Sequence, residues 1–324
     1  MRKSGFSEKI MLQSRKTRRP VVLCAGIAVE DFIFKVDAFP EPGAKIYAAE
    51  LIATPGGCAA NAAVAVARLG GEARFAGPVG TDEASSRFLA GMARSGVDTS
   101  GVIRVEGASI SVSGIFIDHA GEKMVATRRG AQLGEARPAD PDRLVADIDA
   151  VMADNRFPDF VEPILRAASR RGIVVVLDGD RATQPDDPLF GIASHIVFSS
   201  EALRATSGLP DLEAALRVIA RFAHGFLAVT NGPDDVIWLA GTTVRRMPVF
   251  AVEAVDTLGA GDTFHGAFAL ALAEGLGRRA GEEPVAAMRF AAAAAALKCT
   301  RFGGISGTPH RAEVEAFMAG REPA

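Results

Sequence analysis

Apolar and polar positions along the chain predict a regular alternation of strands and helices that begins at Val21. Short continuous apolar runs predict buried strands at 21–25, 73–79, 151–153, 173–177, 195–198 and 226–230. Stretches with helical spacing lie between them, at 61–69, 85–94, 161–171, 212–222, 261–273 and 284–298. Such an alternation predicts an α/β fold, with a mostly parallel central sheet that helices cover on both faces.

Two segments do not follow this rhythm. Apolar and polar residues alternate at about 32–52 and again at 110–127, with breaks at Pro40, Pro42 and Gly43 and a turn at 119–121. Alternation with a period of two is typical of half-exposed strands. We therefore expect a small antiparallel β-sheet that stands off the main body as a lid, formed by segments about 32–54 and 108–128.

Composition and charge narrow the class of protein. Among 324 residues, 48% are hydrophobic and 23% charged, and the formal net charge is -3. These values fit a globular enzyme and give no electrostatic reason to expect nucleic acid or a membrane as a partner. Residues 1–20 are basic and lack the apolar stretch of a secretory signal, so we expect a disordered basic extension. No run of about 18 apolar residues predicts a membrane span.

The three cysteines, Cys24, Cys58 and Cys299, are far apart in the sequence, and no CxxC pair occurs. This spacing argues against a disulfide framework and a zinc site. It also favours a reducing compartment, so we expect a cytoplasmic protein.

The segment 256–264 (DTLGAGDTF) holds the strongest chemical signal. Gly259, Ala260 and Gly261 permit a tight turn whose backbone N–H groups converge, and the predicted helix points its N-terminus at the same place. Such a concavity binds phosphate oxygens and stabilises charge that develops during phosphoryl transfer. Asp262 at the helix start could accept a proton from an attacking hydroxyl, or it could simply cap the helix.

This segment resembles the C-terminal signature of the ribokinase-like, or phosphofructokinase-B, carbohydrate kinases. The similarity continues in consistent order over roughly residues 21–318. Its other elements are Gly26 followed by Asp31, then Gly56-Gly57 with Asn61, 77–82 (GPVGTD), and Thr230-Asn231-Gly232. The resemblance implies that residues 21–324 form one ATP-dependent kinase domain that transfers phosphate to a sugar hydroxyl.

The resemblance also implies roles for these residues. Asp262 would be the catalytic base, with the backbone of Gly259, Ala260 and Gly261 stabilising the transferred group. Asp31, Gly57 and Asn61 would bind sugar hydroxyls. Thr230 and Gly232, together with Gly259 and Gly261, would contact ATP, which reacts as its Mg²⁺ complex. Family members often dimerise through the lid, so we expect a homodimer.

Within the family, the chain is most similar to 6-deoxy-6-sulfofructose kinases, through the runs at 177–180 (LDGD), 262–267 (DTFHGA) and 295–301 (AALKCTR). Lys45 and Arg156 match the cations that those enzymes place against the sulfonate, and Arg128 and Arg129 could join them. An anionic substituent requires such a group in a partly desolvated cleft. Thr127 replaces an Asn of that subgroup. We therefore favour an anionic, sulfofructose-like sugar, with fructose, ribose, 2-keto-3-deoxygluconate or a nucleoside as alternatives.

The cation sites depart from the family pattern. The stretch 199–202 (SSEA) replaces the Asn-x-x-Glu element that organises Mg²⁺. The resemblance implies a monovalent cation, such as K⁺, bound by Asp256 and by carbonyls near 298–303, but Gly307 replaces a Ser ligand there. His265 is interpreted as a packing residue.

Two further classes remain open. A protein that keeps this fold but only senses sugar or nucleotide would lack turnover, and the intact turn at Asp262 argues against it. An NAD-dependent oxidoreductase is disfavoured because no GxGxxG follows the first strand.

Overall fold

The computed structural model describes residues 18–277 and 283–321. Nine strands form the large sheet, in the order β15-β14-β13-β12-β11-β10-β1-β4-β6. Their bounds are β1 Val21–Ala25, β4 Glu72–Ala76, β6 Val97–Asp98, β10 Ala150–Asp154, β11 Val174–Gly179, β12 His195–Ser199, β13 Phe226–Asn231, β14 Asp234–Ala240 and β15 Thr243–Met247. All neighbours from β6 to β13 pair in parallel, and β14 and β15 extend the sheet antiparallel. This confirms the predicted fold class.

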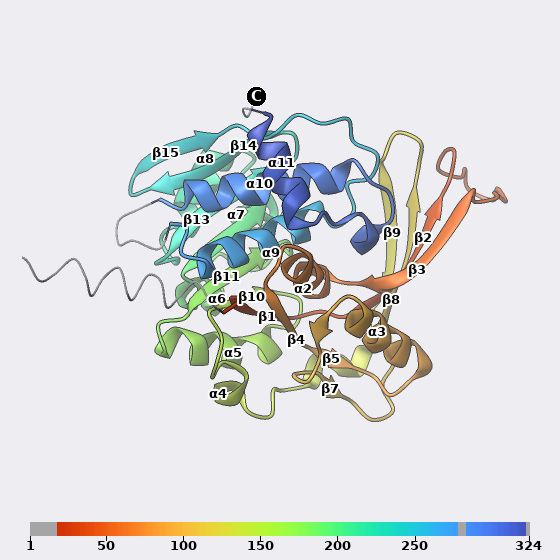
Figure 1. The fold of residues 1–324 in the computed structure, drawn as a ribbon, viewed down its shortest axis with the longest axis horizontal. Coiled ribbons are helices and arrows are strands. Elements are labelled where there is room, and N and C mark those ends of the chain that lie inside the picture. Colours follow the sequence, from red (N-terminus) through yellow and green to blue (C-terminus); the bar gives the residue numbers. More distant parts are fainter. Residues whose placement is uncertain (1–17, 278–282, 322–324) are drawn as a thin grey trace, which may run out of the picture.

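Helices cover both faces of this sheet (Figure 1). Their bounds are α2 Cys58–Arg68, α3 Glu83–Arg94, α4 Pro141–Leu144, α5 Pro158–Arg170, α6 Pro188–Ile192, α7 Ser200–Ser207, α8 Leu212–Ile219, α9 Ala260–Ala273, α10 Val285–Cys299 and α11 Arg311–Ala319. Two 3₁₀ helices, η2 Ala131–Glu135 and η3 Gly304–Gly307, complete the helical elements of the described residues. The sequence pattern does not predict α4, α6, α7 or α11.

Alternate residues of each central strand serve two separate cores. In β1, Val22 and Cys24 face the core built with α2, α9 and α10, whereas Leu23 faces the core built with α5 and α8. Because both faces of the strand are buried, its sequence is a continuous apolar run. Helices α2 and α9 pack closely: a Cβ at Gly266 would lie 2.4 Å from the carbonyl oxygen of Ala62. This packing fixes the N-termini of the two helices relative to each other.

The predicted small sheet projects from one end of the molecule (Figure 1). Its order is β3-β2-β8-β9, with bounds β2 Val29–Lys35, β3 Glu50–Gly56, β8 Ser111–Ile117 and β9 Lys123–Arg128. The two outer pairs are antiparallel and the central pair β2-β8 is parallel. A further short pair joins β5 Pro78–Val79 to β7 Ile103–Arg104. Strand β3 ends at Gly56, two residues beyond the predicted lid segment 32–54, because the register with β2 pairs Lys35 with Glu50 and Val29 with Gly56.

Residues 1–17 of the predicted basic extension lie outside the described residues. Arg18 is described, and its guanidinium lies 2.8 Å from a carboxylate oxygen of Asp149. None of the described helices combines the length and apolar character needed to cross a lipid bilayer.

Candidate active site

The candidate active site lies where β10 and β11 end and where α2 and α9 begin. The Sγ of Cys58, at the start of α2, and carboxylate oxygens of Asp178 and Asp262 lie within 4.8 Å of one another. Asp178 is the penultimate residue of β11, and Asp262 is in the first turn of α9. Ligands of open α/β sheets bind at the carboxyl ends of the strands, so this position is a candidate binding site on topology alone.

The turn before α9 presents free backbone N–H groups. Gly259 is the N-cap of α9 and has a φ of 76°, in the left-handed region that favours glycine. The N–H of Ala260 donates to the carbonyl of Thr257 at 3.3 Å, whereas no acceptor within the described residues faces the N–H of Gly259, Gly261 or Asp262. The first N–H groups of a helix have no intrahelical partner, so these three can bind an anion. We refer to residues 259–262 as the anion-binding turn.

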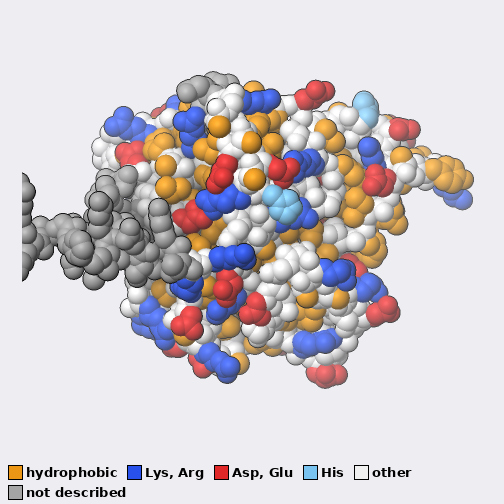
Figure 2. All heavy atoms as spheres, in the orientation of Figure 1, with side chains coloured by type: hydrophobic (Ala, Val, Ile, Leu, Met, Phe, Trp, Pro, Cys, Tyr) orange, Lys and Arg blue, Asp and Glu red, His pale blue; other side chains and the backbone are white. Residues whose placement is uncertain are grey.

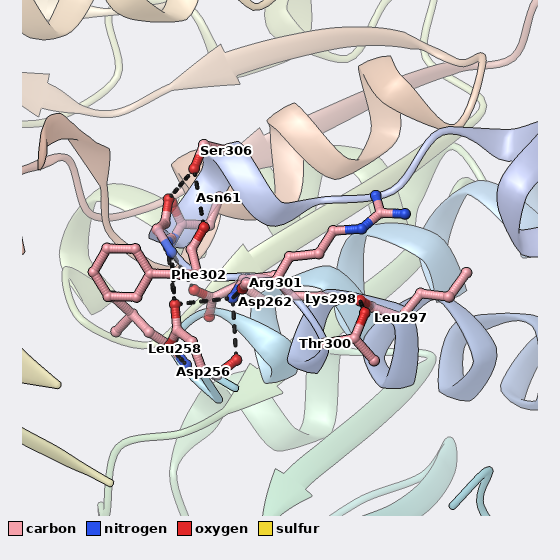
Figure 3. A network of polar contacts seen from close by, with 12 residues as sticks. Asn61, Asp256, Leu258, Asp262, Leu297, Lys298, Thr300, Arg301, Phe302 and Ser306 are labelled. Carbon is pink, nitrogen blue, oxygen red and sulfur yellow. Dashed lines mark hydrogen bonds and ion pairs between the residues drawn. The ribbon is translucent and has the colours of Figure 1, made fainter. Parts of the chain in front are cut away.

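The carboxyl group of Asp262 has a pKa in the neutral range. Burial raises the pKa of Asp262 to about 6; Asp180 and Asp154 add to the rise, and a hydrogen bond from Asn61 and the charge of Lys123 oppose it. The Asn61 amide donates to Asp262 Oδ2 at 2.7 Å (Figure 3). A carboxylate with such a pKa is suited to general-base catalysis near neutral pH.

Asp31, the predicted sugar ligand on β2, faces the same place. Burial raises its pKa to about 7; a hydrogen bond from Ser113 opposes the rise, and the charge of Asp262 adds to it. Gly56 gives the Asp31 carboxylate its space, because a Cβ at Gly56 would lie 1.8 Å from Oδ2. The structure thus brings Asp31, Asn61 and Asp262 together around one position.

Asp154, at the end of β10, links three backbone segments of the site through hydrogen bonds. Its Oδ2 accepts the N–H of Ile27 at 2.8 Å and of Ala59 at 3.1 Å, and its Oδ1 accepts the N–H of Arg156 at 2.9 Å. Ala59 is in the first turn of α2, where backbone N–H groups have no acceptor within the helix. The Asp154 carboxylate on β10 supplies that acceptor. The helix consequently begins at Cys58, after Gly57 with a φ of 99°, rather than at the predicted Asn61.

Three arginines lie beside the residues that are predicted to bind the sugar. Arg156 contacts the carboxylate of Asp180. Burial lowers the pKa of Arg129, and the nearby charges of Arg181 and Arg156 lower it further. Arg129 therefore lies close to both Arg156 and Arg181, and we call these three residues the arginine cluster. Lys45, the other predicted anion ligand, is exposed in the loop between β2 and β3, and the described residues give it no contact with Arg156.

The predicted nucleotide contacts lie farther along the same sheet edge. Thr230 is near the end of β13, with its hydroxyl 3.3 Å from the carbonyl oxygen of Phe198, and Gly232 has a φ of 62° in the following turn. Helix α9 also packs near these strands, because its residue His265 places Nε2 3.1 Å from the carbonyl oxygen of Val197 on β12, the neighbour of β13. The anion-binding turn therefore lies between the residues predicted to bind the sugar and those predicted to contact the nucleotide.

His265 is buried in contacts with other residues, and none of the three cysteines has the features of an activated nucleophile. Both ring nitrogens of buried His265 contact carbonyl oxygens, Nδ1 that of Gly261 at 2.8 Å and Nε2 that of Val197. This agrees with its interpretation as a packing residue. The three cysteines form no disulfide, and burial raises the pKa of each thiol, which is opposite to the shift of an activated nucleophile.

Asp256, the predicted cation ligand, is buried just before the anion-binding turn. Its Oδ1 accepts the N–H of Leu258 at 2.7 Å, and its Oδ2 lies 3.3 Å from the ammonium of Lys298 (Figure 3). Asp154, Asp178 and Lys298 are site residues to which sequence reasoning assigned no role. The position of the two aspartates at the ends of parallel strands is a signal that could have identified them.

Known proteins resemble this chain in sequence and in fold. The sequence profile "pfkB family carbohydrate kinase" matches residues 20–311. A ribokinase of Bacillus subtilis is 29% identical over 89% of this chain and 96% of its own. An ATP-dependent ribose-1-phosphate kinase of Halopiger xanaduensis is 30% identical over 93% and 98%. The crystal structure of a provisionally assigned ribokinase from Agrobacterium tumefaciens is 40% identical and covers 94% of this chain and 100% of its own, with a TM-score of 0.87. The chain therefore belongs to the pfkB family of carbohydrate kinases.

Proposed function

We propose that this ATP-dependent carbohydrate kinase phosphorylates a primary hydroxyl of a ketose or related sugar that carries an anionic group, with Asp262 as the base. The sugar oxygen attacks the γ-phosphorus, the bond from that phosphorus to the ADP oxygen breaks, and the hydroxyl proton passes to the Asp262 carboxylate. The observation that carries this proposal is the carboxylate of Asp262, with a pKa of about 6, beside the free N–H groups of the anion-binding turn.

The surrounding residues would position the two substrates. Asp31, Gly57 and Asn61 would bind sugar hydroxyls and align the attacking oxygen. The N–H groups of the anion-binding turn would stabilise charge on the transferred group, while the Mg²⁺ that accompanies ATP neutralises the triphosphate. Thr230 and Gly232 would contact the nucleotide.

The arginine cluster supports an anionic substrate. The guanidinium groups of Arg156 and Arg181 lie close enough to lower the pKa of Arg129, and an anion placed beside Arg129 would relieve that repulsion. A sulfonate, phosphate or carboxylate can accept paired hydrogen bonds from such groups. A sulfofructose-like sugar remains the favoured substrate, and a relative that acts on ribose 1-phosphate provides a precedent for a phosphorylated one.

We also propose that two copies associate through the small sheet. Leu51, Phe34, Phe116 and Met124 share one register row across its four strands, and the rings of Phe34 and Phe116 stack with centroids 5.3 Å apart. Leu51 and Met124 are about half exposed. Figure 2 shows hydrophobic side chains gathered at the end of the molecule where Figure 1 places this sheet. An apolar row of this kind suits a self-complementary interface.

An ADP-release screen with neutral, phosphorylated, carboxylated and sulfonated sugars tests the proposed reaction. We expect an anionic sugar to give the highest kcat/KM, and Asp262→Asn to lose on the order of 10² or more in kcat. Arg156→Met should raise KM for the anionic sugar roughly tenfold or more, because a charge-assisted contact is lost. Arg166→Met, an exposed arginine on α5, is the matched control. Turnover of neutral sugars alone would refute the anionic preference, and near-normal turnover by Asp262→Asn would refute the role of the base.

A further inference from the structure

Lys298, near the end of α10, is a fully buried lysine. Its Nζ lies 3.2 Å from the carbonyl oxygen of Asp256, 3.3 Å from Asp256 Oδ2 and 3.2 Å from the carbonyl oxygen of Arg301. An ammonium group has three N–H donors, and here each has an oxygen acceptor. Lysine is rarely buried completely, and when it is, it requires partners of this kind.

This ammonium stabilises the segment that shapes the anion-binding turn. The Asp256 carboxylate beside it accepts the N–H of Leu258 at 2.7 Å, one residue before the N-cap Gly259. The same carboxylate accepts the N–H of Gly303 at 2.9 Å, in the loop after α10. Figure 3 marks the contacts of the Lys298 ammonium with Asp256 and Arg301. The ammonium of Lys298 and the carboxylate of Asp256 thus link the turn before α9 to the loop after α10.

The three oxygen acceptors around Lys298 Nζ form a partial cage of the donor type that hard cations prefer. Two carbonyl oxygens and one carboxylate converge on one point, and such oxygen donors suit cations of this class. In this chain Lys298 Nζ already occupies that point, so the K⁺ implied by the resemblance does not fit there.

Gly307 leaves space for the side chain of Lys298, because it has no Cβ. A Cβ at position 307 would lie 3.2 Å from Lys298 Cδ and 2.9 Å from the carbonyl oxygen of Arg301. Any larger residue there would crowd both the lysine stem and the cage. Gly307, which departs from the family pattern, and Lys298 therefore form one coupled arrangement.

We propose that Lys298 is a positioning residue whose ammonium takes the place of a dissociable monovalent cation behind the anion-binding turn, so that turnover needs no K⁺. This inference rests on the proposed function of that turn in phosphoryl transfer.

The first test measures turnover of the full chain in Tris or tetramethylammonium buffers, with and without KCl at constant ionic strength. The wild type should change by less than about twofold. Lys298→Ala, which removes the cation and leaves space, should lose roughly 10- to 100-fold in kcat because the turn shifts. KCl should restore much of this loss. Lys298→Met, which fills the space with an apolar stem, should be impaired without rescue, and Arg166→Met serves as the control.

A double variant, Lys298→Ala with Gly307→Ser, adds a hydroxyl oxygen to the vacated cage. It should respond to K⁺ at a lower concentration than Lys298→Ala alone. A wild type that K⁺ activates tenfold or more would overturn the proposal, and so would a folded Lys298→Ala variant with normal turnover in the absence of K⁺.

Thermal unfolding separates this inference from the proposed function. KCl, but not tetramethylammonium chloride, should raise the Tm of Lys298→Ala and leave that of the wild type unchanged, because ligand binding stabilises the folded state. This readout requires no substrate. If no sugar releases ADP in any salt, the proposed function fails while a K⁺-selective Tm shift still supports the role of Lys298. A Tm of Lys298→Ala that responds equally to both salts overturns it.

Discussion

At the scale of single residues, the site contains two carboxyl groups whose pKa values differ and which face the same position. Burial raises the pKa of Asp262 to about 6 and that of Asp31 to about 7. In the proposed reaction both groups act as hydrogen-bond or proton acceptors, and both must therefore be ionised. Protonation of either one should reduce kcat/KM as the pH falls.

The acidic side of the pH profile should consequently reflect two groups. As the pH falls through about 7 and then about 6, log kcat/KM should decline with a slope that approaches about two. Asp31→Asn, although less active, should leave a slope of about one, because only Asp262 still titrates. The measurement is initial-rate kinetics at saturating Mg²⁺ and ATP.

Ser113 provides a control for that interpretation. Its hydrogen bond lowers the pKa of Asp31. Ser113→Ala should therefore move the upper inflection to higher pH and leave the lower one in place. A wild-type profile that stays flat down to about pH 5 would contradict the assigned roles.

The sequence predicts the reacting groups better than the groups that hold them. Asp262 and the glycines beside it are contiguous, so one segment predicts the turn and its base. Lys298 acts through contact with Asp256, 42 residues away, and through space left by Gly307. No local pattern predicts this contact, because it exists only once α10 and η3 have folded around the turn.

At the scale of elements, the buried strands of the large sheet follow from their apolar runs, whereas element starts depend on distant partners. Helix α2 begins three residues before the predicted position because Asp154 on β10 accepts the N–H of Ala59. The start of β3 is set by its register with β2. Local periodicity contains neither constraint.

Asp154 should therefore matter for stability as well as activity. Asp154→Ala leaves the buried N–H groups of Ile27 and Ala59 without their acceptor, which should cost about 2 kcal/mol of unfolding free energy. Urea unfolding measures this change. Asp140→Ala is the control, because Asp140 caps the exposed helix α4 and its loss should cost about 1 kcal/mol or less. Equal midpoints for Asp154→Ala and the wild type would contradict the structural role of Asp154.

At the scale of the whole molecule, the small sheet has one face that the rest of the described chain leaves open. Ile33, Ile115 and Ile117 on one side pack with Ile52, Leu258 and Phe302 near the site. The row through Leu51 and Met124 has no such cover. The alternating pattern predicts that these strands have two unlike faces, but it does not reveal what covers the second one.

The proposed dimer accounts for this open row and leads to a direct test. Sedimentation equilibrium at micromolar concentration should give twice the monomer mass for the wild type. A double variant, Leu51→Glu with Met124→Glu, should weaken association about 100-fold or more, because it buries unpaired carboxylates at the centre of an apolar interface. Val285→Glu, at the exposed start of α10, is the matched control and should remain dimeric. A wild-type monomer, or a double variant that dimerises normally, would place the interface elsewhere and leave the apolar row to serve another contact.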